Sequence, residues 1–298
     1  MPPPGVRGIT SIPTLSQLYR TGTVLASKKK DLPTPNAELN EKICTIRYDI
    51  TKLEVDAIVN AANRRLLGGG GVDGAIHLAA GPKLLEECRT LKGCNTGSAK
   101  VTDAYDLPCK KVIHAVGPVY DDDDETSEPL LRGCYRTSLQ LAVENDCKSI
   151  AFSAISTGIY GYPSKEASIA ALSEVKKFLE QPDGQKIDKV VFVNFMGKDV
   201  AAYNESMPEI FPPTEEDQHE KVPSMQELIN EASEGASTNP RPEDASVVER
   251  TPSISWEEPL YLTAAQVELE PRGSTTADGD RERRGTNVKP DESNAGGR

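Results

Sequence analysis

Hydrophobic periodicity divides the chain into a structured part and a polar C-terminal part. Short apolar or alternating runs predict strands over residues 43–49, 57–59, 98–105, 111–116, 149–155 and 189–195. Apolar residues three and four apart predict helices over residues 72–80, 82–90, 128–145, 164–179 and 199–206. Because strands and helices alternate, the pattern indicates an α/β/α layered domain with a mostly parallel sheet.

The same pattern sets the expected domain limits. Apolar residues at helical spacing between Ile12 and Tyr19 predict a lead-in helix. We expect a disordered N-terminus over residues 1–10 and a folded domain over residues 11–213, with its core at residues 43–212. We expect a disordered acidic tail over residues 214–298.

The predicted tail, from residue 214 to the last residue, carries 19 Asp and Glu against 9 Lys and Arg and is rich in Pro, Ser, Gly and Glu. Such a segment cannot bury enough apolar surface to offset its ordering entropy. Two apolar islands, residues 224–232 and 254–262, are candidate partner-binding segments, although such islands also occur by chance in tails.

Charge and composition narrow the functional classes. The net charge is -12, and the tail accounts for -10 of it, so residues 1–213 are nearly neutral. The predicted domain has no basic stripe, which argues against direct nucleic-acid binding. A phosphate ligand would have to be held by backbone dipoles rather than by a field of Lys and Arg. No run of 18 apolar residues occurs, so we expect no membrane span.

The six cysteines form no C-x-x-C pair, and the three histidines do not cluster with them along the sequence. We therefore expect no disulfide framework, no zinc site and no cofactor. Residues 1–40 have basic and hydroxyl residues before the first acid, Asp31, which weakly suits a mitochondrial transit peptide. Prolines interrupt any long amphipathic helix there, so we expect a cytoplasmic and/or nuclear location, with the mitochondrion as the alternative.

Candidate chemistry begins after the strand at residues 57–59, where Asn60 and Asn63 precede a run of four glycines and a predicted helix. A strand, a glycine loop and a helix N-terminus together make a site for phosphate. The glycines also satisfy the Rossmann pattern G-x-G-x-x-G. Against a Rossmann site, residues 61–67 separate the strand from the glycines, and no acidic residue ends a second strand about 20 residues on.

Residues 156–161 form a second candidate phosphate loop, between the strand ending at Ile155 and the helix from Ser164. Consecutive N–H groups there could bind a diphosphate, although taken by itself the pattern favours an ordinary strand-to-helix turn. Two such loops in one small domain favour a single ligand held between them. A diphosphate-linked nucleoside fits that arrangement.

These segments resemble the macrodomain family, and in detail its MacroD-type branch. The motifs that carry the resemblance are Asn60-Ala61-Ala62-Asn63, the glycines before Val72-Asp73-Gly74, Ile76-His77 before Ala79-Ala80-Gly81, Ile155 to Pro163, and Asp49-Ile50-Thr51. They span about residues 43–212. The resemblance implies the three-layer macrodomain fold with a mixed central sheet, and ADP-ribose as the ligand.

The resemblance also assigns roles to residues. It implies Asp49 and Ile50 at adenine with Phe195 near its face, and Asn63 and Asp73 at the distal ribose. Asn60, where the strand ends, is a further candidate ligand-binding residue. It implies the following residues around the phosphates: Gly70, Gly71, Val72, Ser156, Thr157, Gly158, Ile159 and Tyr160, with Tyr160 covering the distal ribose. Without the motif, Asp49 and Asn63 read as ordinary turn or cap residues.

Asp73 is the expected catalytic residue, supported by Asn63 and His77. Hydrolysis at an anomeric carbon passes through a cationic state, which a neighbouring carboxylate can stabilise while it positions water. His77 lies four residues on, on the same helix face, and a hydrogen bond between them could orient the carboxylate. The alternatives are that Asp73 complements the helix dipole and that His77 is structural.

The resemblance implies a hydrolase that removes mono-ADP-ribose from Asp and Glu side chains of proteins without a metal, and that also acts as an O-acetyl-ADP-ribose deacetylase. The alternative is a reader that binds ADP-ribose without turnover. The expected partners are ADP-ribose and mono-ADP-ribosylated proteins, and we expect a monomer. The chain departs from the family pattern at Tyr48, Arg64, Arg65 and Leu78, and the last three could change how a modified protein docks.

Overall fold

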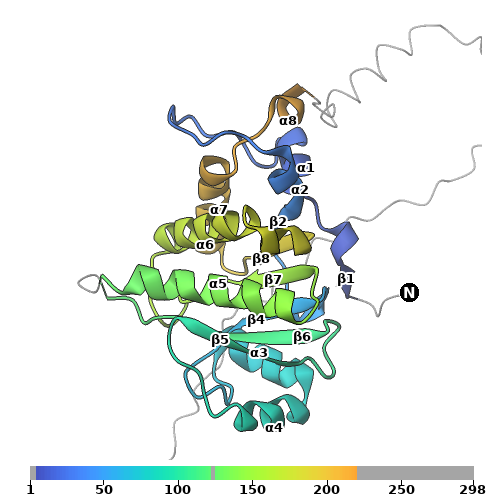
Figure 1. The fold of residues 1–298 in the computed structure, drawn as a ribbon, viewed down its shortest axis with the longest axis vertical. Coiled ribbons are helices and arrows are strands. Elements are labelled where there is room, and N and C mark those ends of the chain that lie inside the picture. The colour runs from blue at the N-terminus through green and yellow to red at the C-terminus, as the bar shows by residue number, and fades with distance from the viewer. Residues whose placement is uncertain (1–4, 122–124, 220–298) are drawn as a thin grey trace, which may run out of the picture. The chain divides into compact units, whose positions relative to one another are not determined.

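The computed structural model describes residues 5–121 and 125–219, whose arrangement is shown in Figure 1. A six-stranded sheet lies at the centre, with the strand order β2-β8-β7-β4-β6-β5. Its strands are β2 (Ile43–Ile46), β4 (Ala57–Ala61), β5 (Ser98–Asp103), β6 (Lys111–Val116), β7 (Ser149–Ser153) and β8 (Lys189–Val193). Within this sheet only β5 and β6 pair in antiparallel fashion, which confirms the expected mixed sheet.

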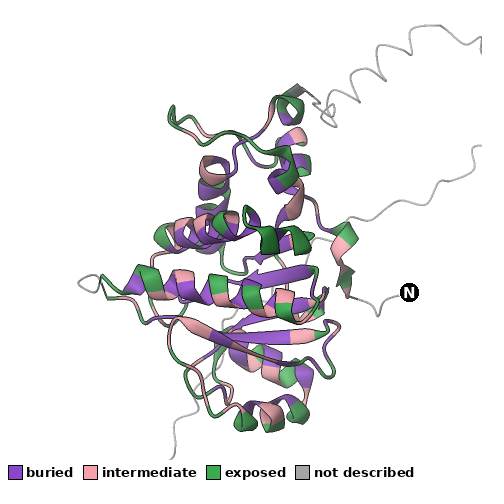
Figure 2. Ribbon diagram, viewed as in Figure 1, coloured by how far each residue is buried: buried purple, intermediate pink, exposed green. Residues whose placement is uncertain are grey.

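Helices cover both faces of the sheet and complete three layers (Figure 1). The larger ones are α3 (Gly71–Ala80), α4 (Pro82–Thr90), α5 (Ser127–Glu144), α6 (Ser164–Leu179) and α7 (Gly197–Ile210). Successive side chains of a strand point to opposite faces. Accordingly Val59 joins the core cluster formed with α5 and α6, whereas Ile58 joins the cluster formed with α3 and α4. Figure 2 shows the buried residues along the strands and on the inner sides of these helices.

Short elements at the two ends of the described region correct our expected limits. Residues 7–8, within the segment expected to be disordered, form β1 (Arg7–Gly8), which pairs with β3 (Leu53–Glu54). The lead-in helix α1 (Leu15–Arg20) begins at a capping box, and α2 (Ala37–Lys42) follows it. Helix α8 (Glu215–His219) lies beyond the expected boundary at residue 213. The remaining tail, including both apolar islands, lies outside the described residues.

Several expected strands end two or three residues earlier in the structure. The strand expected over residues 43–49 stops at Ile46, since Asp49 caps the 3₁₀ helix η2 (Ile50–Lys52). A second 3₁₀ helix, η1 (Ile9–Ser11), follows β1, and a third, η3 (Pro182–Lys186), precedes β8. The last large helix is longer than expected, residues 197–210 instead of 199–206.

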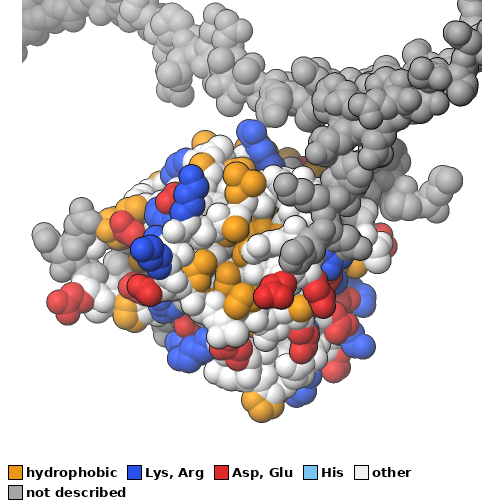
Figure 3. All heavy atoms as spheres, turned by 90° about the horizontal axis from the view of Figure 1, so that it is seen from above, with side chains coloured by type: hydrophobic (Ala, Val, Ile, Leu, Met, Phe, Trp, Pro, Cys, Tyr) orange, Lys and Arg blue, Asp and Glu red, His pale blue; other side chains and the backbone are white. Residues whose placement is uncertain are grey.

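The surface of the described region is mixed in charge. Figure 3 shows Lys and Arg side chains interspersed with Asp and Glu on the face seen from above, with hydrophobic side chains between them. None of the described helices is long and apolar enough to cross a bilayer. All six cysteines are unpaired thiols.

The sheet topology determines where a ligand can bind. Strand β4 lies between β6 and β7, and the chain passes from β6 through α5 to β7 on the other side of β4. The direction of winding therefore reverses at β4. In open α/β sheets such a reversal opens a crevice at the carboxyl ends of the strands, where ligands bind.

Candidate functional site

A cleft of about 300 Å³ lies at this edge of the sheet, between the segments that follow β4, β6 and β7. Both candidate phosphate loops line it. The lining residues are Ala61, Ala62, Asn63, Gly69, Gly70, Gly71, Val72, Asp73, Gly117, Ala154, Ile155, Ser156, Gly158, Ile159 and Tyr160. A Cβ built on Gly70 would lie 4.0 Å from Cδ1 of Ile159, so the two loops approach each other across the cleft.

The first loop delivers the N-terminus of α3 to the cleft. Gly70 is the N-cap of α3 and offers no side chain to the first N–H groups, which leaves them available to an anion. Gly71 has φ of 62°, a left-handed conformation that favours glycine. A Cβ on Gly74 would lie 2.5 Å from the carbonyl oxygen of Gly69, so the loop can fold back on the helix only with glycine there.

The second loop is held in a strained and closed conformation. Ser156 adopts φ of 66°, which is uncommon for a residue with a side chain and is a form of strain found at ligand sites. Its hydroxyl is buried and has no hydrogen-bond partner within the described part of the chain. The amide of Tyr162 donates to the Ser156 carbonyl at 3.0 Å, and Lys198 Nζ donates to the Thr157 carbonyl. The loop is thus supported from behind while the Ser156 hydroxyl is left for a ligand.

Asp73 is the buried carboxylate of the cleft, and 3% of the residue is exposed. Its Oδ1 accepts a hydrogen bond of 2.7 Å from Asn60 Nδ2, and its Oδ2 lies 3.4 Å from Asn63 Nδ2. Burial raises the pKa of Asp73, while the bond from Asn60 and the nearby His77 oppose that rise. A carboxylate that loses hydration yet keeps oriented donors is suited to stabilise a cation or to position water.

His77 does not form the hydrogen bond to Asp73 that we expected. Its Nε2 lies 3.6 Å from Asp73 Oδ1, beyond hydrogen-bond distance, and has no hydrogen-bond partner among the described residues. The ring instead packs beside the first loop, since a Cβ on Gly68 would lie 3.5 Å from it. His77 therefore packs beside Asp73 and the first loop without a hydrogen bond to the carboxylate.

Behind Asp73, a buried histidine holds Asn60 in one orientation. His114 Nδ1 lies 3.1 Å from Asn60 Nδ2, whose two protons then serve Asp73 and His114. His114 Nδ1 must accept, so Nε2 carries the ring proton, and Thr102 Oγ1 lies 3.0 Å from that nitrogen. Burial lowers the pKa of His114 to about 3, which keeps the ring neutral and this tautomer in place.

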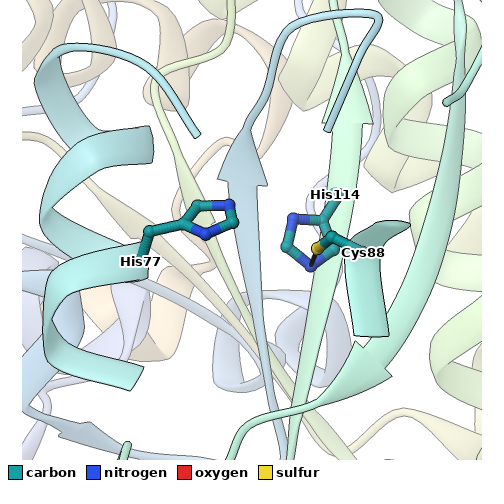
Figure 4. A group of neighbouring side chains, drawn as sticks. All are labelled: His77, Cys88 and His114. Atoms are coloured by element: carbon teal, nitrogen blue, oxygen red, sulfur yellow. Dashed lines mark hydrogen bonds between the residues drawn. The ribbon is translucent and has the colours of Figure 1, made fainter. Parts of the chain in front are cut away.

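His114 also belongs to the one cluster in the described region that could hold a metal ion. Figure 4 shows His77, Cys88 and His114 converging from α3, α4 and β6. Their possible ligand atoms all lie within 4.8 Å of one another. This corrects our expectation that histidines and cysteines do not cluster. Both nitrogens of His114 already have partners, and burial raises the pKa of the Cys88 thiol to about 11. The donor set therefore fits a neutral hydrogen-bonded cluster better than a metal site.

The structure brings most of the predicted ligand-binding residues into one cleft, but not all of them. Asn60 is fully buried and donates to Asp73, and it does not line the cleft, so its role as a ligand-binding residue stays a prediction. Asp49 Oδ1 accepts from the amide and hydroxyl of Thr51, so its side chain acts at least as a cap. Ile50 is buried in the core, and Phe195 is 70% exposed beyond β8. Neither lines the cleft, so their adenine roles stay predictions.

Sequence reasoning missed three residues that shape the site. His114 and Thr102 lie on β6 and β5, and no local pattern marks them as neighbours of Asn60. Gly117 lines the cleft, and a Cβ there would lie 2.1 Å from Ser156 Oγ, so only glycine fits beside the second loop. Its position directly after a predicted strand was the one signal that could have pointed to it.

Comparison with known proteins agrees with this geometry. The Macro domain family model matches residues 59–171. The chain is 48% identical over 205 residues to the bovine protein ADP-ribose glycohydrolase MACROD1, covering 68% of this chain and 62% of that protein's length. It is 54% identical over 168 residues to a macro domain-containing protein of Chlorobaculum tepidum, covering 56% of this chain and 96% of the relative.

Solved structures support the fold. The crystal structure of a Trypanosoma brucei macrodomain in complex with ADP-ribose matches with a TM-score of 0.59 and 39% identity, covering 69% of this chain and 78% of the other. The match to the family model includes both loops of the cleft, because it begins within β4 and ends within α6.

Proposed function

This chain belongs to the macrodomain family, in its MacroD-type branch, and we propose that it hydrolyses mono-ADP-ribose from Asp and Glu side chains of modified proteins. A relative named as an ADP-ribose glycohydrolase and a related macrodomain solved with ADP-ribose support this proposal. The observation that carries it is the buried Asp73 carboxylate between two backbone loops suited to a diphosphate. In a binding module the same carboxylate would only accept hydrogen bonds from ribose hydroxyls, so turnover distinguishes the two functions.

The proposed binding mode follows from the cleft. The diphosphate lies between the N-terminus of α3 and the second loop, where backbone N–H groups and the Ser156 hydroxyl donate to it. The distal ribose then lies beside Asn63 and Asp73, with Tyr160 over it. The adenine extends toward the carboxyl ends of β2 and β8, which pair side by side and precede Asp49 and Phe195.

In the proposed reaction, water attacks the anomeric carbon of the distal ribose. The bond from that carbon to the acyl oxygen breaks, the protein leaves as a carboxylate, and the water oxygen becomes the ribose hydroxyl while its proton passes to solvent. Asp73 stabilises the cationic character at the carbon and orients the water. O-acetyl-ADP-ribose is a proposed second substrate because it also carries an ester on this ribose. No residue role in this scheme calls for a metal.

The test measures ADP-ribose release from a protein mono-ADP-ribosylated on glutamate, in EDTA, by wild type and by Asp73→Ala. We expect release by wild type and a loss of at least about 100-fold in the variant, because a positioned carboxylate contributes on that scale. Calorimetry with ADP-ribose serves as the control for an intact cleft. Tight ADP-ribose binding by wild type without any release would make the protein a reader and refute the hydrolase proposal.

A further inference from the structure

A second hollow, of about 340 Å³, lies between the segment that follows Asn63 and the carboxyl end of α4. Its lining includes the cations Arg64, Arg65, Arg89 and Lys92, and we call it the basic hollow. All four residues are exposed, and none forms an ion pair with a described carboxylate.

Several cations elsewhere on the described surface are paired. Lys110 lies 2.6 Å from Asp56, Lys111 lies 2.7 Å from Asp103, and Arg132 lies 2.7 Å from Glu128. Residues 1–213 are nearly neutral overall, so four unpaired positive charges around one hollow make a local excess of positive charge. Such a group attracts an anionic partner and raises its local concentration.

The hollow is preformed because its walls are fixed by backbone packing. Lys92 and Gly93 both adopt left-handed conformations, with φ of 55° and 81°, and make a tight turn after α4. The amide of Cys94 then donates to the Arg64 carbonyl at 3.0 Å. A Cβ on Gly93 would lie 2.7 Å from the same carbonyl, so the turn sits directly against Arg64. An adjoining hollow of about 440 Å³ shares Arg64 and Lys92 and adds Lys100.

The chain passes directly from the Asp73 end of the cleft to the basic hollow. Arg64 directly follows Asn63, which lines the cleft and lies 3.4 Å from Asp73. In the proposed reaction the modified side chain leaves from the carbon beside Asp73, so the polypeptide that carries it must pass close to this segment. An extended acidic peptide can place several carboxylates against these unpaired cations, so the two are complementary in charge.

We propose that the basic hollow binds the acidic residues that flank an ADP-ribosylated glutamate or aspartate, and so selects modified sites in acidic sequence. This inference rests on the proposed function. Of the two occupants that the charges allow, a substrate segment and the acidic tail of this same chain, the position beside the leaving group favours the substrate.

The experiment uses the full chain and two peptides with one mono-ADP-ribosylated glutamate, flanked by glutamates in one peptide and by glutamines in the other. Turnover and peptide affinity are measured for wild type, for Arg64→Gln/Arg89→Gln/Lys92→Gln, and for a control of equal charge, Lys30→Gln/Lys148→Gln/Lys177→Gln. The control residues are exposed and line none of the hollows described above.

We expect wild type and the control to prefer the acidic peptide by at least about threefold in kcat/KM, through KM, because several exposed pairs each contribute a small energy. The hollow variant should lose this preference while keeping its rate on the neutral peptide, and added salt should weaken the preference of wild type.

Equal kcat/KM and affinity for both peptides in wild type would overturn the proposal. A hollow variant that turns over both peptides faster than wild type would also overturn it, because it would show that the hollow holds the chain's own tail. If neither peptide is hydrolysed but wild type binds the acidic one more tightly and the hollow variant does not, the docking inference stands and the hydrolase proposal fails.

Discussion

The side-chain amide of Asn60 donates to Asp73 Oδ1 across 2.7 Å at the base of the cleft, and the direction of this bond is fixed from behind. The other Nδ2 proton of Asn60 faces His114 Nδ1 at 3.1 Å. A flipped amide would place its oxygen against the carboxylate and would leave His114 without a donor. The buried histidine therefore keeps a donor aimed at the carboxylate of the proposed reaction.

This relationship predicts a positioning role for His114. His114→Leu removes the acceptor that orients Asn60, so the amide can flip and Asp73 loses its shortest hydrogen bond. We expect kcat to fall about tenfold, corresponding to roughly 1.4 kcal/mol, and the acidic limb of the pH profile to move to higher pH. His114→Asn keeps an acceptor near the Nδ1 position and should restore part of the rate. An unchanged pH profile in His114→Leu, in a folded protein that still binds ADP-ribose, would contradict the role.

The ionised Asp73 side chain should lower the stability of the folded protein while it supports activity. Burial raises its pKa, so the ionised carboxylate opposes folding once the pH exceeds the ordinary value of 3.8. Asp73→Asn should therefore melt at a higher temperature than wild type at neutral pH, and the difference should shrink as the pH falls toward 3.8. Turnover should fall by at least about 100-fold. Thermal melts at several pH values test this, and a variant less stable at neutral pH would contradict it.

The activity of wild type should depend on the same ionisation. The proposed role requires the carboxylate form of Asp73, whose pKa lies above the ordinary value of 3.8. Turnover should therefore decline as the solution is acidified, and the midpoint should lie above 3.8. A pH–rate profile between mild acid and neutral pH measures this midpoint, and a flat profile down to pH 3.8 would exclude Asp73 as the group that must be ionised.

The first loop should tolerate no side chain at Gly74. A methyl group there would lie 2.5 Å from the Gly69 carbonyl, which is backbone and can move only if the loop moves. We expect Gly74→Ala to weaken ADP-ribose binding by about tenfold or more in calorimetry, since overpacking costs about 1–3 kcal/mol. Gly197→Ala is the matched control, because a Cβ there meets nothing within 4 Å. Equal affinities in the two variants would show that the loop geometry is not needed.

Asp217 should anchor the last described helix in a pH-dependent way. Burial alone would raise its pKa, but hydrogen bonds from Thr214 and Asn40 outweigh burial and hold the pKa below its ordinary value. The stability that ionised Asp217 gives to the folded protein should be present above pH 3.8 and should be lost as the pH falls through the lowered pKa of Asp217.

Asp217→Asn should therefore cost about 1–3 kcal/mol at neutral pH, and the cost should disappear in acid. Denaturant unfolding measures this, with the exposed Asp146→Asn as a control that should cost less than about 0.5 kcal/mol. A cost that persists unchanged in acid would mean that shape, not charge, anchors α8.

The sequence alone determined the layered α/β class, the order of the main elements, the two loops and the candidacy of Asp73. These follow from local signals: the periods of strands and helices, glycines beside a helix start, and family motifs contained in short segments. The ends of the elements were less certain, since capping by residues such as Asp49 and pairing by residues 7–8 depend on contacts that a local pattern does not encode.

Only the tertiary structure decided what stands behind and beside Asp73. Asn60 and His114 are cross-strand neighbours because of the register of β4 on β6, and a shift by one residue would turn His114 to the other face of the sheet. Thr102 reaches the same ring from β5, and Cys88 reaches it from α4. At the basic hollow, likewise, the backbone hydrogen bond from the Cys94 amide to the Arg64 carbonyl holds the turn at Lys92 and Gly93 beside Arg64. Such neighbours are set by packing between distant segments, which composition and periodicity do not specify.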